Sequence, residues 1–312
     1  MPHRASGWRL SRFVSSRPGL QLLLLVLLAG PACTESPMTY PVGAIGIVAA
    51  ENFYGNIAEQ IGGDRVMVTS LLSDPNADPH AYESNAADAK AVATARIIIK
   101  NGLGYDAFID KLAGASPRPN RTVISVGDLT GHKEGDNPHI WYDPTTMSKL
   151  AETLASSLAQ VDPAGADYYS GRLQAFGSSM KIVNDQIAAI KAQYQAVRII
   201  ATEPVFDYMA GVLALDLVGK GGAFQRAVAD GNDPPAAAVA DFRQQLSSGG
   251  VKVLIYNSQA VTPMSVQMQD YARQRNIPVM AVTETEPAGQ SYQQWMLDQL
   301  KKLQSLLSGQ GG

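Results

Sequence analysis

The stretch Asn137-Pro138-His139-Ile140-Trp141-Tyr142-Asp143-Pro144 indicates both a local fold and a candidate ligand. Two prolines restrict its backbone, and Pro138 disfavours a helical conformation at the residue before it. Asp143 followed by Pro144 is typical of a helix start, with the aspartate as N-cap and the proline at the first helical position. We therefore predict that His139 lies in a rigid loop before a helix, where it can hold a ligand.

A second stretch is built in the same way. A single loop histidine is more often a solvated surface residue than a ligand. This chain has four histidines, and His80 also follows a proline, in Asp74-Pro75-Asn76-Ala77-Asp78-Pro79-His80-Ala81-Tyr82-Glu83. That stretch follows the strand-like run Val66 to Leu72. The recurrence favours a ligand role for both His80 and His139.

Composition limits the class of protein. The chain has 312 residues, of which 46% are hydrophobic and 17% charged, which is enough for two domains with a sizeable core. The net charge of −3 provides no electrostatic basis for binding nucleic acid. Cys33 is the single cysteine, so no internal disulfide can form.

The first 32 residues have the layout of a signal peptide. They hold four arginines and no acidic residue, then an apolar run from Leu22 to Ala29, then Gly30-Pro31-Ala32. The run is shorter than the about 20 apolar residues that a transmembrane helix needs. The lone Cys33 directly after it predicts lipid attachment at a new N-terminus, and ordinary cleavage after Ala32 is the alternative.

Short apolar runs alternate with helical patterns over the rest of the chain. This alternation predicts an α/β fold of two lobes, each with a mostly parallel sheet covered by helices. A helical pattern over 162–194 would span about 50 Å if unbroken and would join the lobes. The predicted parts are a signal peptide (1–32), a tether (33–43), an N-terminal lobe (44–161), a linking helix (162–195), a C-terminal lobe (196–307) and a flexible tail (308–312).

Four side chains follow predicted strands at the edge where open α/β sheets bind ligands, which is outside the carboxyl ends of the strands. They are His80 and His139 in the first lobe and Glu203 and Glu284 in the second. Neutral imidazole nitrogen and carboxylate oxygen are donors that divalent metals accept. Their joint placement predicts a metal site in the cleft between the lobes, although either glutamate alone would more often be a surface carboxylate.

Other candidates stay open at this point. Glu286 competes with Glu284 for the fourth position, and Glu83 and Asp143 are further acidic candidates that the residues alone do not rank. His132 lies in a polar loop and is expected to be solvated rather than a ligand.

Two glycine-rich stretches resemble nucleotide-binding loops. Gly102-Leu103-Gly104-Tyr105-Asp106-Ala107 fits G-x-G-x-x-A, and Asp128 stands at about the right distance for a ribose contact, but the match is not in the first βα unit. Gly219-Lys220-Gly221-Gly222 lacks the spacing and the Ser/Thr of a phosphate-binding loop and is predicted to be a turn.

From about Ala44 to Leu307 the chain resembles the zinc and manganese solute-binding proteins of bacterial ABC importers, the TroA-like family. The resemblance is carried, in order, by Ala49-Ala50-Glu51-Asn52-Phe53-Tyr54-Gly55, Asp78-Pro79-His80-Ala81-Tyr82-Glu83, Asn101-Gly102-Leu103-Gly104-Tyr105-Asp106, the stretch from Asn137 to Pro144, Glu203-Pro204-Val205-Phe206-Asp207-Tyr208-Met209 and Thr283-Glu284-Thr285-Glu286-Pro287. It implies two α/β lobes joined by one long helix, with a metal between them.

The resemblance also implies the ligands. The family's first two ligands match His80 and His139, its third position, His or Glu, matches Glu203, and Glu284 stands where the family usually has Asp. Members with Glu at the third position lean toward manganese, and the short segment from Gly131 to Asp136 lacks the His-rich loop of many zinc members. Zinc should nevertheless bind more tightly than manganese. Two glutamates that each bound through both oxygens would raise the donor count toward six, as manganese prefers.

The expected function is that of an extracytoplasmic binding protein, not an enzyme. It would capture zinc or manganese as cargo and deliver it to an ABC permease and its ATPase, as a monomer in the periplasm or lipid-anchored through Cys33 to the outer face of the cytoplasmic membrane. An exported metal-dependent hydrolase is one alternative, although no H-E-x-x-H cluster is present. An adhesin with a structural metal is another.

Overall fold

The computed structural model describes residues 43–74 and 82–309, which belong to the compact unit Tyr40–Gly312. The predictions made for the signal peptide, for Cys33 and for His80 lie outside the described residues. Two four-stranded parallel sheets form the framework of this unit, as the alternating pattern predicts.

The two sheets have the same topology. The first consists of β1 (Ile45–Glu51), β2 (Val66–Leu72), β3 (Ile97–Lys100) and β4 (Thr122–Ser125), in the order β2-β1-β3-β4. The second consists of β5 (Arg198–Ala201), β6 (Asp216–Val218), β7 (Val251–Asn257) and β8 (Val279–Val282), in the order β6-β5-β7-β8. In each sheet the order in which successive strands are added reverses at one parallel pair, β1/β3 and β5/β7, and such a switch point is where open parallel sheets bind ligands.

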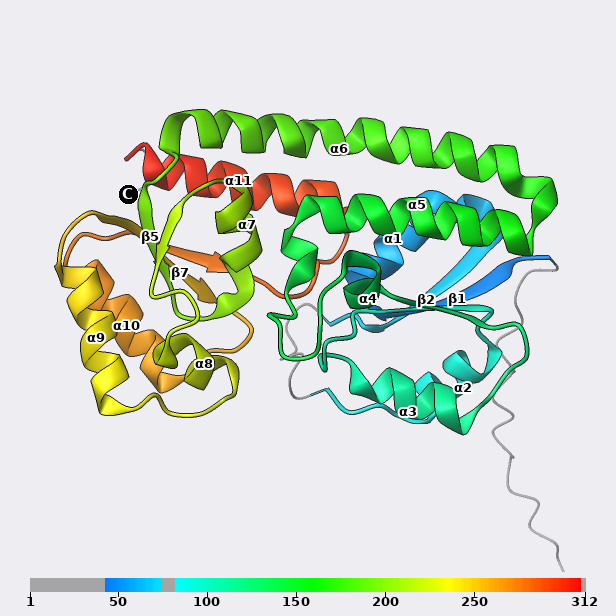
Figure 1. Ribbon diagram of the computed structural model, residues 1–312, viewed down its shortest axis with the longest axis horizontal. Coiled ribbons are helices and arrows are strands. Elements are labelled where there is room, and N and C mark those ends of the chain that lie inside the picture. The colour runs from blue at the N-terminus through cyan, green and yellow to red at the C-terminus, as the bar shows by residue number, and fades with distance from the viewer. Residues whose placement is uncertain (1–42, 75–81, 310–312) are drawn as a thin grey trace, which may run out of the picture. The chain divides into compact units, whose positions relative to one another are not determined.

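Helices cover both faces of each sheet (Figure 1). Their bounds are α1 (Asn52–Gly62), α2 (Ala86–Thr94), α3 (Ala107–Ala115), α4 (Val126–Thr130), α5 (Pro144–Val161), α6 (Ala166–Tyr194), α7 (Asp207–Val212), α8 (Ala223–Ala229), α9 (Ala236–Ser247), α10 (Pro263–Arg273) and α11 (Tyr292–Leu307). Four short 3₁₀ turns among the described residues are η1 (Gly63–Arg65), η3 (Ile140–Tyr142), η4 (Pro163–Gly165) and η5 (Pro204–Phe206).

The strands are apolar on both faces because both faces are covered. In β1, Ile47 and Ala49 belong to the core that contains α1 and α5, whereas Val48 and Ala50 belong to the core beneath α2 and α3. In the second sheet, successive strand side chains likewise belong alternately to the core that contains α11 and to the core that contains α9 and α10. Trp141 is fully buried in the first of these cores, where its ring stacks on that of Phe53 at 4.5 Å. The apolar part of the opening stretch is therefore core.

The long helix expected between the two halves of the chain is α6, which packs against α5 and α11 (Figure 1). It begins at Ala166, because Pro163–Gly165 forms the separate turn η4. Its 29 residues correspond to about 44 Å at 1.5 Å per residue. The predicted lobe boundaries, at 161 and 196, stay a prediction.

Two helices were not expected from the sequence. The apolar run 121–126 predicts a strand up to Val126, but β4 ends at Ser125. Val126 instead begins the short helix α4, which Gly131 ends in a left-handed conformation with φ 79°. The helix α8 follows the predicted turn at 219–222. None of the helices within residues 43–74 and 82–309 has the length and apolar composition of a membrane span.

Candidate metal centre

His139 is held in a fixed orientation by Asn137. The amide nitrogen of Asn137 donates to the carbonyl of Pro204 at 2.7 Å, so its Oδ1 faces the histidine. That oxygen accepts from the backbone N–H of His139 at 3.0 Å and lies 2.7 Å from ring Nδ1. Because an amide oxygen can only accept, Nδ1 carries the proton of this bond, and Nε2 of the neutral ring is left with a lone pair for a metal.

The helix start predicted after His139 is confirmed. Asp143 is the N-cap of α5, where its carboxylate accepts from the backbone N–H of Thr145 at 2.9 Å, and Pro144 is the first helical residue. Asp143 also accepts from the hydroxyl of Thr145 at 2.8 Å, so this acidic candidate serves the helix terminus. His139 itself is 2% exposed, and its ring contacts the ring of Trp141 edge-on, with 5.2 Å between centroids.

Glu203 and Glu284 meet at the carboxyl edge of the second sheet. Glu203 comes two residues after β5 and Glu284 two residues after β8, and both are buried. Asn257, the last residue of β7, donates through Nδ2 to Glu203 Oε2 at 3.1 Å and to Glu284 Oε1 at 2.6 Å. Glu203 and Glu284 therefore both accept a hydrogen bond from the side chain of Asn257.

Glu284 also contacts the first half of the chain. Its Oε2 lies 3.4 Å from His139 Nε2 and accepts from the phenol of Tyr105 at 2.7 Å. Burial and the carboxylate of Glu284 raise the pKa of Tyr105 well above its ordinary value, which keeps the phenol a proton donor. His139, Glu203 and Glu284 are therefore linked around Asn257 and Tyr105.

Glu286 has different neighbours. Its backbone N–H donates to Asn52 Oδ1 at 3.0 Å, and Asn52 Nδ2 donates back to the Glu286 carbonyl at 2.7 Å. Burial, and to a lesser extent the charge of Glu59, raises the pKa of Glu286 to about 8. These contacts attach Glu286 to α1, so the geometry favours Glu284 over Glu286 as the partner of His139.

Two further carboxyl groups are buried beneath the first-sheet loops. Glu51, at the end of β1, is fully buried, and burial followed by the charge of Asp106 raises its pKa well above the ordinary value. Burial raises the pKa of Asp106 to about 6, although the backbone N–H groups of Gly102 and Asn101 oppose the shift. Asn101 in turn donates to the carbonyl of Pro138 at 3.1 Å and so supports the His139 loop.

The same contacts explain the apparent nucleotide-binding loop. In such a loop the backbone N–H groups hold a phosphate. Here the carboxylate of Asp106 accepts from the N–H of Asn101 at 2.6 Å and from that of Gly102 at 2.9 Å. The protein's own anion occupies these donors, which disfavours a nucleotide at this position.

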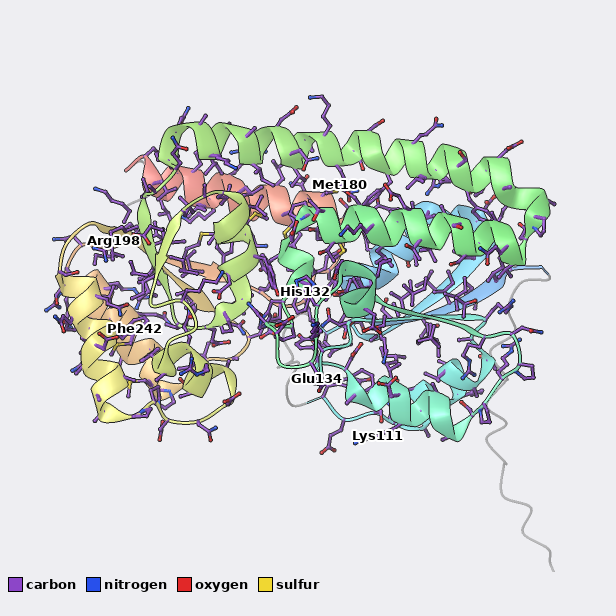
Figure 2. The ribbon with its side chains drawn as sticks, viewed as in Figure 1. Lys111, His132, Glu134, Met180, Arg198 and Phe242 are labelled. Carbon is purple, nitrogen blue, oxygen red and sulfur yellow. The ribbon has the colours of Figure 1, made fainter. Side chains whose placement is uncertain are left out.

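The remaining histidine and acidic candidates lie elsewhere. His132, which is labelled in Figure 2, is half-buried. Its Nδ1 lies 2.8 Å from the hydroxyl of Thr130, and its ring contacts the ring of Tyr208 edge-on. Glu83 is exposed. No three His, Cys, Asp or Glu side chains within residues 43–74 and 82–309 form a group that could hold a metal ion by themselves. His80 lies outside that range.

A pocket of about 480 Å³ reaches His139 from the surface. Residues from both halves of the chain line it, among them Tyr105, Pro138, Pro204 and Asp230. A larger hollow of about 750 Å³ lies at the opposite edge of the second sheet, next to Gly250, and none of the candidate ligands lines it. The smaller pocket is thus the one that belongs to the candidate site.

Sequence reasoning missed the supporting residues. Asn257 directly follows the apolar run 251–256, which the sequence predicts to be a strand, but its amide is not one of the donor types that predict a metal site. Tyr105 and Asn137 stand inside quoted motifs without a role. The position of Asn257 at the carboxyl end of an expected strand is the signal in the sequence that points to it.

Comparison with known proteins gives one family and several relatives. Residues 47–306 match the family model of zinc-uptake complex component A, periplasmic. The manganese-binding lipoprotein MntA of Halalkalibacterium halodurans is 26% identical over 206 residues, which is 64% of this chain and 68% of that protein. The metal ABC transporter substrate-binding lipoprotein ScbA of Streptococcus cristatus is 26% identical over 182 residues, which is 54% of this chain and 58% of that protein.

Solved structures share the fold. The solute-binding protein FpvC of P. aeruginosa, in complex with Ni²⁺, superposes with a TM-score of 0.70 at 20% identity, over 86% of this chain and 98% of that one. The crystal structure of ZnuA gives a TM-score of 0.67 at 22% identity, over 86% of this chain and 99% of that one. Two parallel sheets covered by helices are therefore the architecture of these proteins too.

Proposed function

We propose that this chain, which belongs to the family of the periplasmic zinc-uptake complex component A, is the solute-binding protein of a metal importer. It captures a divalent transition metal outside the cytoplasmic membrane and delivers it to an ABC permease and its ATPase. Two relatives support this assignment: the manganese-binding lipoprotein MntA and the metal ABC transporter substrate-binding lipoprotein ScbA. The mature protein starts at Cys33 with a lipid anchor or is free in the periplasm.

The observation that carries the proposal is the pairing of His139 with Glu284. Nε2 of the histidine and Oε2 of the glutamate come from opposite halves of the chain and lie 3.4 Å apart. Both side chains are buried, and Asn137 turns the metal-binding nitrogen of the ring toward the carboxylate. We assign the metal ligands as His80, His139, Glu203 and Glu284.

This burial favours cargo binding over catalysis. A catalytic zinc keeps one position open for water and needs room for a substrate. Here the candidate ligands His139, Glu203 and Glu284 are 2%, 3% and 0% exposed. Ligand side chains buried in this way suit an ion that is stripped of water and held, rather than one that activates water.

Two imidazoles and two carboxylates form a mixed donor set, so we propose that the site accepts both zinc and manganese. Divalent affinity generally rises from manganese to zinc, so zinc is the tighter binder in direct competition. Binding weakens on acidification, because an imidazole must be neutral to coordinate a metal.

The test is a metal titration of chelator-treated protein. The wild type should bind zinc, and alanine at His80, His139, Glu203 or Glu284 should weaken binding by more than about 100-fold, which exceeds the loss expected for a supporting hydrogen bond. His132→Ala is the matched control and should bind as the wild type does. A wild type that binds neither zinc nor manganese, or ligand variants that bind like the control, would overturn the proposal.

A further inference from the structure

The side chain of Gln259 holds the backbone of the loop that carries Glu284. Its Oε1 accepts from the backbone N–H of Glu284 at 2.6 Å and from that of Thr285 at 3.0 Å, and its Nε2 donates to the hydroxyl of Thr285 at 2.6 Å. Gln259 comes two residues after β7, and Glu284 comes two residues after β8. One amide group therefore attaches the loop after β8 to the loop after β7.

The two N–H groups that Gln259 accepts from belong to residues that water does not reach. Glu284 and Thr285 are each 0% exposed. A buried backbone N–H without an acceptor is costly, so such groups are almost always paired. Loss of the Gln259 oxygen would therefore favour a different backbone conformation at 284–285, in which these groups reach another acceptor, and the side chain of Glu284 would turn with the backbone.

Gln259 also acts on the carboxylate end of Glu284, through Asn257. The backbone N–H of Gln259 donates to Asn257 Oδ1 at 2.9 Å, so the other end of that amide, Nδ2, faces Glu284 Oε1, to which it donates at 2.6 Å. The second carboxylate oxygen, Oε2, accepts from the phenol of Tyr105 at 2.7 Å. Both donors meet the carboxylate only while the backbone of Glu284 keeps its position, and the side chain of Gln259 holds that position.

The result is a Glu284 carboxylate that lies beside His139, with 3.4 Å between Glu284 Oε2 and His139 Nε2. Residues that hold a metal's ligands by hydrogen bonds orient those ligands and change the affinity for the metal. We propose that Gln259 is a positioning residue, which holds Glu284 where its carboxylate and His139 bind the same ion. The inference rests on the proposed function, because it takes Glu284 to be a ligand.

The experiment asks whether Gln259 acts on the metal through Glu284. Gln259→Met keeps the length of the side chain but removes the amide oxygen and nitrogen. Gln259→Asn draws the oxygen back by about 1.5 Å, and it serves if the methionine variant does not fold. Each change is made in the wild type, in Glu203→Ala and in Glu284→Ala, and zinc affinity is measured by competition with a chelator.

Gln225→Met is the matched control. Gln225 also uses its side chain to hold backbone groups, since its Oε1 accepts from the N–H of Gly221 at 2.7 Å and its Nε2 donates to the carbonyl of Ala201 at 3.2 Å. Neither of these partners is a candidate ligand. The Gln225 variant should therefore bind zinc as the wild type does.

In the wild type and in Glu203→Ala, each Gln259 variant should weaken zinc binding by about 10- to 100-fold. In Glu284→Ala the same change should cause no further loss, because the residue through which Gln259 acts has no carboxylate there. A purely structural role would instead weaken binding by the same factor in all three backgrounds. Bound Co²⁺ provides a second measurement, because its visible absorption reports the geometry of its ligands. The absorption should change in the Gln259 variants and stay the same in Gln225→Met.

The outcomes separate this inference from the proposed function. A wild type that binds no zinc, or a Glu284→Ala variant that binds it as tightly as the wild type, contradicts the proposed site itself. If the wild type binds zinc and Glu284→Ala binds it weakly, two results overturn the inference and leave the proposed function standing. They are wild-type zinc affinity and cobalt absorption in the Gln259 variants, or an equal loss of affinity in all three backgrounds.

Discussion

Replacing Asn137 with alanine tests whether the orientation of His139, and not merely its presence, makes the site. The substitution removes the acceptor for the backbone N–H and for Nδ1 of His139, and the donor to the carbonyl of Pro204. Each such bond contributes about 0.5–1.5 kcal/mol net. Three bonds therefore set an upper limit of about 4.5 kcal/mol on the loss of unfolding free energy. Asn137 is half-buried, so water can replace part of what is lost, and we expect about 2 kcal/mol.

Metal affinity should fall as well, because the imidazole loses the bond that selects its tautomer and its direction. Loss of such a partner costs 10- to 100-fold in affinity, which corresponds to about 1.4–2.8 kcal/mol of binding free energy. The assay is competition for zinc with a chromogenic chelator, with all variants at the same pH. Thermal unfolding of each metal-free variant is measured alongside.

Asn56→Ala is the matched control. Asn56 also bonds across the two halves of the chain, since its Oδ1 accepts from Gln60 Nε2 at 2.6 Å and from the backbone N–H of Tyr292 at 3.1 Å, but it touches no candidate ligand. It should lose stability and keep zinc affinity. Equal affinity losses in Asn56→Ala and Asn137→Ala would show that the effect is general destabilisation. Wild-type affinity in Asn137→Ala would refute the orientation argument directly.

Three more outcomes can be measured on the same protein. Glu284→Ala should weaken zinc binding at least about 10-fold more than Glu286→Ala in a calorimetric titration, and the reverse order would assign the ligand to Glu286. Because burial and Glu59 raise the pKa of Glu286 to about 8, the folded chain keeps a proton that the unfolded chain loses, so the unfolding free energy of metal-free protein should fall from about pH 5 to about pH 8. Denaturant titrations should show a shallower fall for Glu286→Gln, and an unchanged slope would contradict that assignment. Arg121→Ala should cost about 1–3 kcal/mol of stability without changing zinc affinity, because its guanidinium donates to the carbonyls that end α2 and α3.

The parts of the fold that follow from local pattern could be predicted from the sequence. The sequence predicts strands over 66–72 and 279–282 and a helix over 236–247, and β2, β8 and α9 have these bounds, because each is a clear apolar or helical run between turn residues. The five residues of α4 follow directly on an apolar strand, and too few turns are present for a helical period to be visible. The seven residues of α8 are likewise too short for their pattern to stand out between flanking glycines.

The candidate ligands could be proposed from the sequence, whereas the side chains that support them could not. Glu203 and Glu284 come directly after expected strands, and His139 lies in a loop between an expected strand and a helix start. The role of Asn257 depends on β7 lying between β5 and β8, and that strand order is a property of the sheet that local sequence does not encode. The choice of Glu284 over Glu286 likewise depends on which of two nearby residues faces Asn52 of α1.

The contact between α6 and α11 has a mechanical consequence. Gln186 bonds Gln304 at 2.7 Å, and Gln293 bonds the hydroxyl of Ser179 at 2.8 Å, so the two helices are joined side by side at two places along their length. Two helices bonded to each other in this way resist bending more than either helix alone, because bending the pair requires one helix to slide along the other. A force that separates the two sheets is then opposed by shear between the helices. Alanine at Gln304 should therefore let the two helices slide along each other more easily, without changing any candidate ligand.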